Sequence, residues 1–154
     1  MRTWKYGVSL AESSPMTAPL PLEGNLYENM EKAALYGYDA VEFHTRETFS
    51  FDYDKIEQMK AAGKGGICAL VTGRLYTQGH LSLLAEDPAV EERAIAGMKV
   101  YLDKAHRLGT DIVLGWTKGN IPADGDRTAH LRRLAETLKI LDTAAGERGV
   151  KILI

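Results

Sequence analysis

The stretch Gly66-Ile67-Cys68-Ala69-Leu70-Val71-Thr72-Gly73-Arg74 decides the fold. It is a short apolar run with no polar alternation, which is typical of a strand covered on both faces in a parallel sheet. The run ends at Thr72-Gly73, where a polar loop with glycines begins and extends to Glu86. The stretch therefore predicts a central parallel strand whose carboxyl end carries a functional loop. A core strand followed by an ordinary surface loop fits the same residues.

Strands and amphipathic helices alternate on both sides of this central strand. Further strands are expected at residues 5–10, 40–44, 111–116 and 150–154. Helices are expected at residues 25–37, 52–62, 87–109 and 126–149, where apolar side chains recur at helical spacing. Asn25, Asp87-Pro88 and Asp126 are suitable helix starts. The segment 11–24, with Pro15, Pro19 and Pro21, is expected to lack regular structure.

This alternation favours right-handed crossovers and a parallel sheet. Five strands and four helices leave the last strand without a covering helix, and a complete eight-stranded barrel needs about 250 residues. We therefore expect residues 1–154 to form one α/β domain, an incomplete TIM barrel of the type (βα)4β5 with its helices on one face. The alternative is a complete five-stranded doubly wound domain for binding or signalling, which would carry helices on both faces.

The composition excludes several classes of protein. The chain is 45% hydrophobic and 26% charged with a formal net charge of -2, so no general electrostatic attraction to nucleic acid or an anionic membrane is expected. No apolar stretch approaches the roughly 20 residues that span a bilayer. The single cysteine, Cys68, excludes a disulfide framework and suits a reducing cytoplasm. Cys68 is expected to be a small buried hydrophobic residue.

No common catalytic or phosphate-binding motif is present. The glycine-rich segment 61–66 precedes a strand and lacks the spacing of the nucleotide-binding loops, so it is interpreted as a helix end. A Gly-x-Ser-x-Gly elbow is absent, which argues against the usual serine hydrolase. No histidines have metal-ligand spacing, and no cluster with Asp or Glu completes a metal site in this chain.

Candidate site residues lie at the carboxyl ends of the expected strands, where parallel-sheet proteins assemble their sites. Glu42 and His44 have the same parity, so both point to one side of the sheet and can act together in proton transfer. A structural hydrogen-bonded pair is the alternative. The candidates for substrate binding are Thr72, Arg74, Trp116 and Lys118. The two cations among them, Arg74 and Lys118, are suited to binding a phosphate. The alternative is that both are ordinary solvated charges at the rim of the barrel.

Three segments resemble one known family. They are the run from Cys68 to Tyr76 followed by Asp87-Pro88, the run from Arg107 to Gly119, and Val41-Glu42-Phe43-His44. Together they are similar to the third, fourth and second units of the sugar phosphate isomerase/epimerase family, which has the xylose-isomerase-like barrel. The resemblance covers nearly all of the chain and corresponds to the amino-terminal part of that barrel.

The resemblance implies a metal-dependent isomerase or epimerase of sugars, sugar phosphates or related hydroxycarbonyl compounds. In that family a divalent metal (Mn, Mg, Co or Zn) and carboxylates move a proton beside the carbonyl through an enediolate. The family's first metal ligand is a glutamate directly after strand five, which would follow Ile154. This chain by itself is therefore expected to hold no metal and to be inactive.

The resemblance and the open barrel also bear on partners. The endonuclease branch of the superfamily places histidine ligands where this chain has Thr72-Gly73 and Gly115-Trp116, which argues against DNA repair. The expected partner is a small carbohydrate or sugar phosphate. Open sheet edges favour self-association. A further alternative is a non-catalytic partner of a full-length paralogue.

Overall fold

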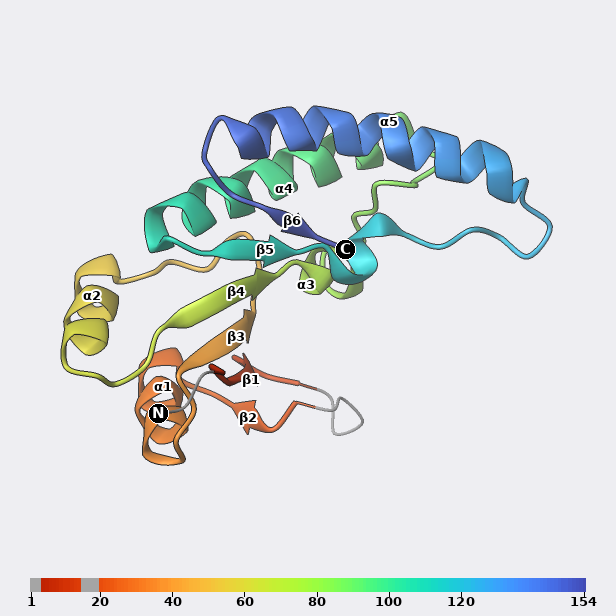
Figure 1. The fold of residues 1–154 in the computed structure, drawn as a ribbon. Coiled ribbons are helices and arrows are strands. Elements are labelled where there is room, and N and C mark those ends of the chain that lie inside the picture. Colours follow the sequence, from red (N-terminus) through yellow and green to blue (C-terminus); the bar gives the residue numbers. More distant parts are fainter. Residues whose placement is uncertain (1–3, 15–19) are drawn as a thin grey trace.

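A computed structural model describes residues 4–14 and 20–154 and contains one parallel sheet. Pro15 and Pro19, part of the expected irregular segment, lie outside the described residues. The strands are β1 (Gly7–Ala11), β2 (Leu22–Glu23), β3 (Ala40–His44), β4 (Ile67–Val71), β5 (Asp111–Val113) and β6 (Ile152–Leu153). Their order across the sheet is β2-β1-β3-β4-β5-β6, and every neighbouring pair is parallel (Figure 1).

The helices that connect these strands begin at capping residues. They are α1 (Leu26–Leu35), α2 (Tyr53–Ala61), α3 (Gly73–Thr77), α4 (Pro88–Leu108) and α5 (Arg127–Gly146), with the 3-10 helix η1 (Gly115–Lys118) after β5. Asn25, Asp52, Asp87 and Asp126 each accept backbone N–H groups at the first turn of the following helix. The sequence therefore sets the starts of the four longer helices.

Strand order separates the two architectures left open by the sequence. From β1 through β3, β4 and β5 to β6, neighbouring strands follow one another in chain order without reversal. A doubly wound sheet reverses its order at a switch point. The two-residue β2 lies on the other side of β1, with no helix between β1 and β2 among the described residues. The strands that are connected by helices are wound in one direction, as in a TIM barrel, and the expected α/β partial barrel is confirmed.

The hydrophobic core lies between the sheet and its helices. Leu10, Phe43, Leu70 and Ile112 occupy neighbouring register positions and are fully buried. They belong to one core cluster with Met30 of α1, Ile56 of α2, Met98 of α4 and Leu141 of α5. On the other face, Glu42 and His44 are partly buried, whereas Ala11, Ala69 and Val71 are buried. The core cluster with the helices lies on the face of Leu10, Phe43, Leu70 and Ile112, and the opposite face corresponds to a barrel interior.

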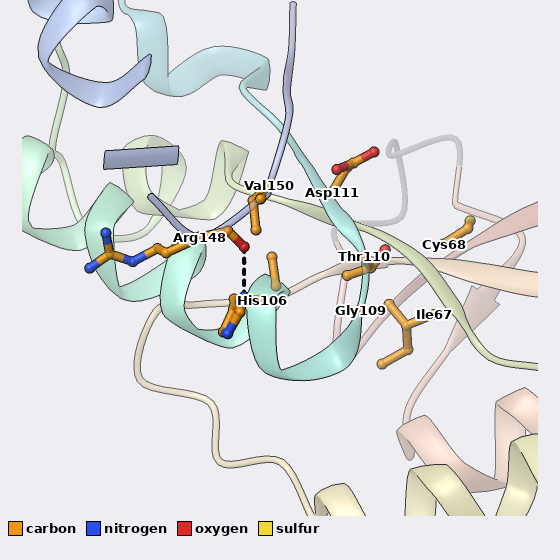
Figure 2. Close-up of a pocket in the computed structure, with 10 residues that line it drawn as sticks. Ile67, Cys68, His106, Gly109, Thr110, Asp111, Arg148 and Val150 are labelled. Atoms are coloured by element: carbon orange, nitrogen blue, oxygen red, sulfur yellow. Dashed lines mark hydrogen bonds between the residues drawn. The ribbon is translucent and has the colours of Figure 1, made fainter. Parts of the chain in front are cut away.

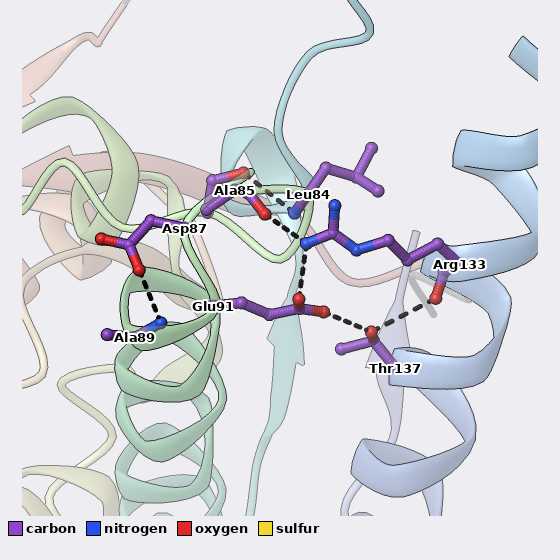
Figure 3. Close-up of polar contacts among 8 residues, drawn as sticks. Leu84, Ala85, Asp87, Ala89, Glu91, Arg133 and Thr137 are labelled. Atoms are coloured by element: carbon purple, nitrogen blue, oxygen red, sulfur yellow. Dashed lines mark hydrogen bonds and ion pairs between the residues drawn. The ribbon is translucent and has the colours of Figure 1, made fainter. Parts of the chain in front are cut away.

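A polar contact ties α4 to α5 near the start of both helices. Glu91 of α4 accepts a hydrogen bond from Arg133 of α5 at 2.5 Å and one from the Thr137 hydroxyl at 2.9 Å (Figure 3). Arg133 also donates to the carbonyl oxygen of Ala85, in the loop before α4. One side chain thus holds the two longest helices and the preceding loop together.

The structure differs from the expected elements at three places. Leu22–Glu23 pairs with the end of β1 although this segment was expected to be irregular, because Leu22 is buried beside β1 and Gly24 donates to the carbonyl of Ala11 at 2.9 Å. The strand expected over 111–116 ends at Val113, and Gly115, with φ of +55°, turns the chain into η1. The loop expected after β4 begins with the short helix α3.

The prediction that Cys68 is buried is wrong. Its residue is exposed, and its Sγ donates to the carbonyl of Val41 at 3.3 Å. The register between β3 and β4 shifts between Val41 and Glu42. This irregularity places Cys68 on the face away from the helices. There its Sγ lies against Gly7, so that a Cβ added at Gly7 would be only 3.0 Å from it.

Candidate functional site

Glu42 and His44 form a hydrogen-bonded pair at the carboxyl end of β3. The distance from His44 Nε2 to Glu42 Oε1 is 3.1 Å. Their side chains are 24% exposed for His44 and 37% exposed for Glu42, so ligands can reach both. The pair is flanked in the sheet by Ser9 and Ala11 of β1 and by Val71 of β4. The prediction that the two side chains share one face is confirmed.

The surroundings of His44 favour its neutral form. Burial lowers the pKa of His44 below its usual value of 6.5, and the nearby positive charge of Arg74 lowers it further. The carboxylate of Glu42 opposes this shift but does not reverse its direction. A neutral imidazole that donates Nε2–H to Glu42 leaves Nδ1 as a proton acceptor. The pair therefore has the form of a base held by a carboxylate.

A second group of residues lies beside this pair, and of these only Glu12 is recognisable from the sequence, as a polar residue that follows a strand. The hydroxyl of Thr45 donates to Glu12 Oε2 at 3.0 Å, and the hydroxyl of Tyr101 on α4 donates to the carbonyl of Thr45 at 2.6 Å. Thr45 and Tyr101 are fully buried, whereas Glu12 is exposed. Glu12 follows β1 directly, as His44 ends β3, and that position is the signal that points to it.

Thr72 joins the loops after β4 and β5. Its hydroxyl donates to the carbonyl of Leu114 at 2.7 Å, and the hydroxyl of Thr117 donates to the carbonyl of Thr72 at 2.7 Å. Both threonines are fully buried. The structure thus places Thr72 under the rim of the sheet, where it fixes η1 against the start of α3.

Arg74 and Trp116 lie at the same rim, and Lys118 stands apart. The Arg74 residue is only 9% exposed. Trp116 is 68% exposed, and its ring centroid lies 6.5 Å from that of Tyr76 in an edge-on arrangement. Asn120 donates to the Tyr76 hydroxyl at 3.0 Å, which steadies this aromatic pair. Lys118 is exposed at the end of η1, and its side chain forms no hydrogen bond or ion pair with the other candidates among the described residues.

The described residues do not fit a metal site. No group of three or more His, Cys, Asp or Glu side chains in residues 4–14 and 20–154 is arranged to hold a metal ion. Glu42 and His44 supply two donor groups at most, and their facing atoms already bind each other. Chemistry that needs a bound metal is therefore not assigned to these residues.

A cavity of about 410 Å³ lies at the other end of the strands. It is lined by residues at the starts of β4 and β5 and before β6, including Ile67, Asp111 and Val150 (Figure 2). His106 Nδ1 is hydrogen-bonded to the carbonyl of Arg148 at 2.6 Å at its edge. Parallel barrels place their chemistry at the carboxyl ends of the strands, so this cavity is separate from the candidate site.

The fold agrees with a comparison of protein families. The model of the xylose isomerase-like TIM barrel matches residues 30–154, which is most of the chain. The chain belongs to the xylose isomerase-like TIM barrel family. No curated protein matches the sequence significantly.

No helix in the described part of the chain is long and apolar enough to cross a membrane.

Several solved structures share this fold at low sequence identity. L-ribulose 3-epimerase is 17% identical with a TM-score of 0.67, and the match covers 96% of this chain and 48% of that one. D-psicose 3-epimerase, solved with D-fructose, is 18% identical with a TM-score of 0.68, covering 97% and 51%. A Thermus thermophilus protein soaked with ZnCl2 is 18% identical with a TM-score of 0.64, covering 97% and 55%. This chain spans about half the length of these structures.

Proposed function

We propose that this chain is the amino-terminal half of an isomerase or epimerase of sugars or sugar phosphates, a single domain over residues 1–154. The observation that carries the proposal is the Glu42–His44 pair, with its 3.1 Å hydrogen bond at the carboxyl end of a barrel strand. The family membership and the fold shared with epimerases of ribulose and psicose support it. The one free cysteine, Cys68, fits a reducing cytoplasm.

His44 moves a proton next to the substrate carbonyl in this proposal. Its pKa, lowered by burial, keeps the imidazole neutral near pH 7. Glu42 accepts the Nε2–H, so that Nδ1 is free to take the proton. As His44 gains that proton, the carboxylate of Glu42 stabilises the positive charge. Glu42 is thus a positioning group and His44 the base.

The remaining candidates bind or align the sugar. Trp116, with Tyr76 beside it, offers an exposed aromatic face on which a sugar ring can stack. Arg74 is a cation at the same rim, and Lys118 is an exposed cation at the end of η1. Thr72, which is fully buried, holds η1 and therefore Trp116 in place through its bond with Leu114 and Thr117. We assign Thr72 to positioning within the substrate-binding wall.

We propose that a divalent metal, where the complete barrel uses one, is held by residues outside this chain. The described residues hold no group of three metal ligands, and the related structures are about twice as long. The Zn-soaked Thermus thermophilus structure has the same fold. The 154-residue chain is then expected to be inactive alone. A non-catalytic partner of a longer paralogue is the rival hypothesis.

The test measures deuterium uptake beside the carbonyl of D-fructose, D-psicose and L-ribulose in D2O with Mn²⁺. Protein from the native source, whose intact mass is determined first, is expected to be near 30 kDa (about 250 residues) and to catalyse exchange. His44→Gln or Glu42→Gln in that protein should lower turnover by about 100-fold or more with unchanged melting temperature. The exposed Glu57→Gln on α2 serves as control. Wild-type turnover in both variants would overturn the roles of His44 and Glu42.

A further inference from the structure

Arg74 carries a positive charge into a nearly buried position beside the candidate site. It lies in α3, directly after β4, and is 9% exposed. Three other partly buried arginines have carboxylate partners: Arg46 with Glu47, Arg133 with Glu91 and Arg148 with Asp103. The side chain of Arg74 makes no hydrogen bond or ion pair with any residue the structure describes.

A guanidinium in this state is costly unless something binds it. Moving a charge out of water without a partner is strongly unfavourable, so buried arginines are paired in most proteins. Among the described residues, the one buried side-chain atom sealed from solvent without a partner is Thr110 Oγ1. The nitrogens of Arg74 are therefore not sealed from solvent.

The charge of Arg74 acts on the site from close range. Burial lowers the pKa of His44 and raises that of Tyr101, and the positive charge of Arg74 adds to the first shift and opposes the second, so the guanidinium lies near the imidazole as well as the buried tyrosine. The three carboxylates that act on His44 or Tyr101 have other partners: Glu42 Oε1 binds His44, Glu12 Oε2 accepts from the Thr45 hydroxyl, and Glu47 is paired with Arg46. None of them neutralises Arg74 by direct contact.

We propose that Arg74 binds a carboxylate of the substrate, and that the substrate is a sugar acid or related hydroxycarbonyl acid. This inference rests on the proposed function and names the substrate class of the same site. A guanidinium fork matches the two oxygens of a carboxylate in a bidentate contact. The guanidinium of Arg74, which has no carboxylate partner, carries one positive charge and so suits the one negative charge of a carboxylate better than the nearly two of a phosphate ester.

The test compares three ligands that differ at one carbon atom. D-fructose, D-fructuronate and D-fructose 6-phosphate are titrated into the 154-residue chain by calorimetry, and the His44 ring signals are followed by NMR. D-fructuronate should bind about tenfold or more tightly than D-fructose and shift the His44 signals, because charge-assisted hydrogen bonds are strong. Arg74→Gln should abolish this preference, whereas Arg132→Gln, at an exposed position on α5, should leave it intact.

Several results would overturn the inference. Equal affinities for D-fructose and D-fructuronate, no binding of any of the three ligands, or a preference unchanged in Arg74→Gln would each do so. If D-fructose 6-phosphate binds more tightly than D-fructuronate and this binding depends on Arg74, the group that Arg74 binds is a phosphate and the carboxylate inference is wrong. Deuterium exchange tests the proposed function separately from the anion site. If D-fructuronate binds in an Arg74-dependent way but the native-source protein catalyses no exchange, the proposed catalysis is rejected and the anion site is still supported.

Discussion

His44 illustrates how burial and pairing oppose each other at a single residue. Removing the imidazole from water disfavours its charged form, and Glu42 at 3.1 Å favours it. Burial has the larger effect, so the pKa of His44 lies below 6.5 in the folded protein. A base for chemistry near neutral pH must be unprotonated, and this environment provides that state.

This pKa shift predicts a pH dependence of stability. Between the lowered folded pKa and 6.5, the unfolded chain binds more protons at His44 than the folded chain does. The contribution of His44 is therefore complete above pH 6.5 and is lost as the pH falls. His44→Gln should lose less free energy of unfolding between pH 7.5 and 5.5 than the wild type, as measured by urea denaturation. An equally steep loss of free energy of unfolding in His44→Gln and in the wild type would contradict the prediction.

For Arg74 we predict that substitution does not destabilise the folded protein, because its charge has no partner. Arg74→Met keeps the aliphatic packing and removes a buried charge, so the free energy of unfolding should stay the same or rise by about 1 kcal/mol. Arg133→Met, which breaks the ion pair with Glu91, should instead lower the free energy of unfolding. Urea denaturation of both variants measures this contrast. A marked loss of stability in Arg74→Met would show that Arg74 supports the fold.

The candidate site was predictable where it depends on strand parity and not where it depends on distant contacts. Glu42 and His44 are two residues apart on one strand, so their common face follows from the sequence. The Thr45–Glu12 bond joins residues 33 positions apart, and the Tyr101–Thr45 bond joins residues 56 apart. Such contacts depend on how distant segments pack, and no local sequence pattern predicts them.

The same distinction holds for whole elements. The longer helices have side-chain caps and apolar stripes over several turns, and each was found within a few residues of its observed limits. Helix α3 has five residues, too few for a periodic pattern. Helix η1 forms because Thr117 is tied to Thr72 on the neighbouring loop, and β2 forms because β1 offers a free edge. Tertiary contacts decide these short elements.

The contact between α4 and α5 should contribute measurably to stability. Glu91 is 19% exposed and Arg133 36% exposed in their side chains, and the Thr137 hydroxyl also donates to Glu91 (Figure 3). A double-mutant cycle of Glu91→Ala and Arg133→Ala should give a coupling energy of about 1 kcal/mol.

The exposed pair Glu136 and Lys139 on α5 provides the matched control. These side chains are 64% and 71% exposed at a distance of 2.8 Å, so a cycle on them should give a coupling energy of at most about 0.5 kcal/mol. Equal coupling in the two cycles, measured by urea denaturation, would mean that burial adds nothing at the α4–α5 contact.

At the scale of the whole molecule, the sheet is open in the part of the chain that the structure describes. Strand β6 forms one edge, and the two-residue β2 covers only the end of β1 at the other. The inner face carries Glu42 and His44 with no helix over it. Trp116, Leu153 and Ile154 are exposed by 68%, 44% and 85% respectively. Unpaired parallel edges and exposed apolar side chains beside them favour association.

We therefore propose that the 154-residue chain self-associates through β6. Leu153→Lys places a charge on this edge strand, which opposes strand pairing. Sedimentation velocity at several concentrations should show oligomers for the wild type and a shift toward monomer for Leu153→Lys. Leu35→Lys is the matched control, since Leu35 is 83% exposed at the end of α1 and belongs to no strand. A wild type that is monomeric throughout, or a Leu153→Lys variant that associates as strongly as the wild type, would reject the β6 edge as the interface.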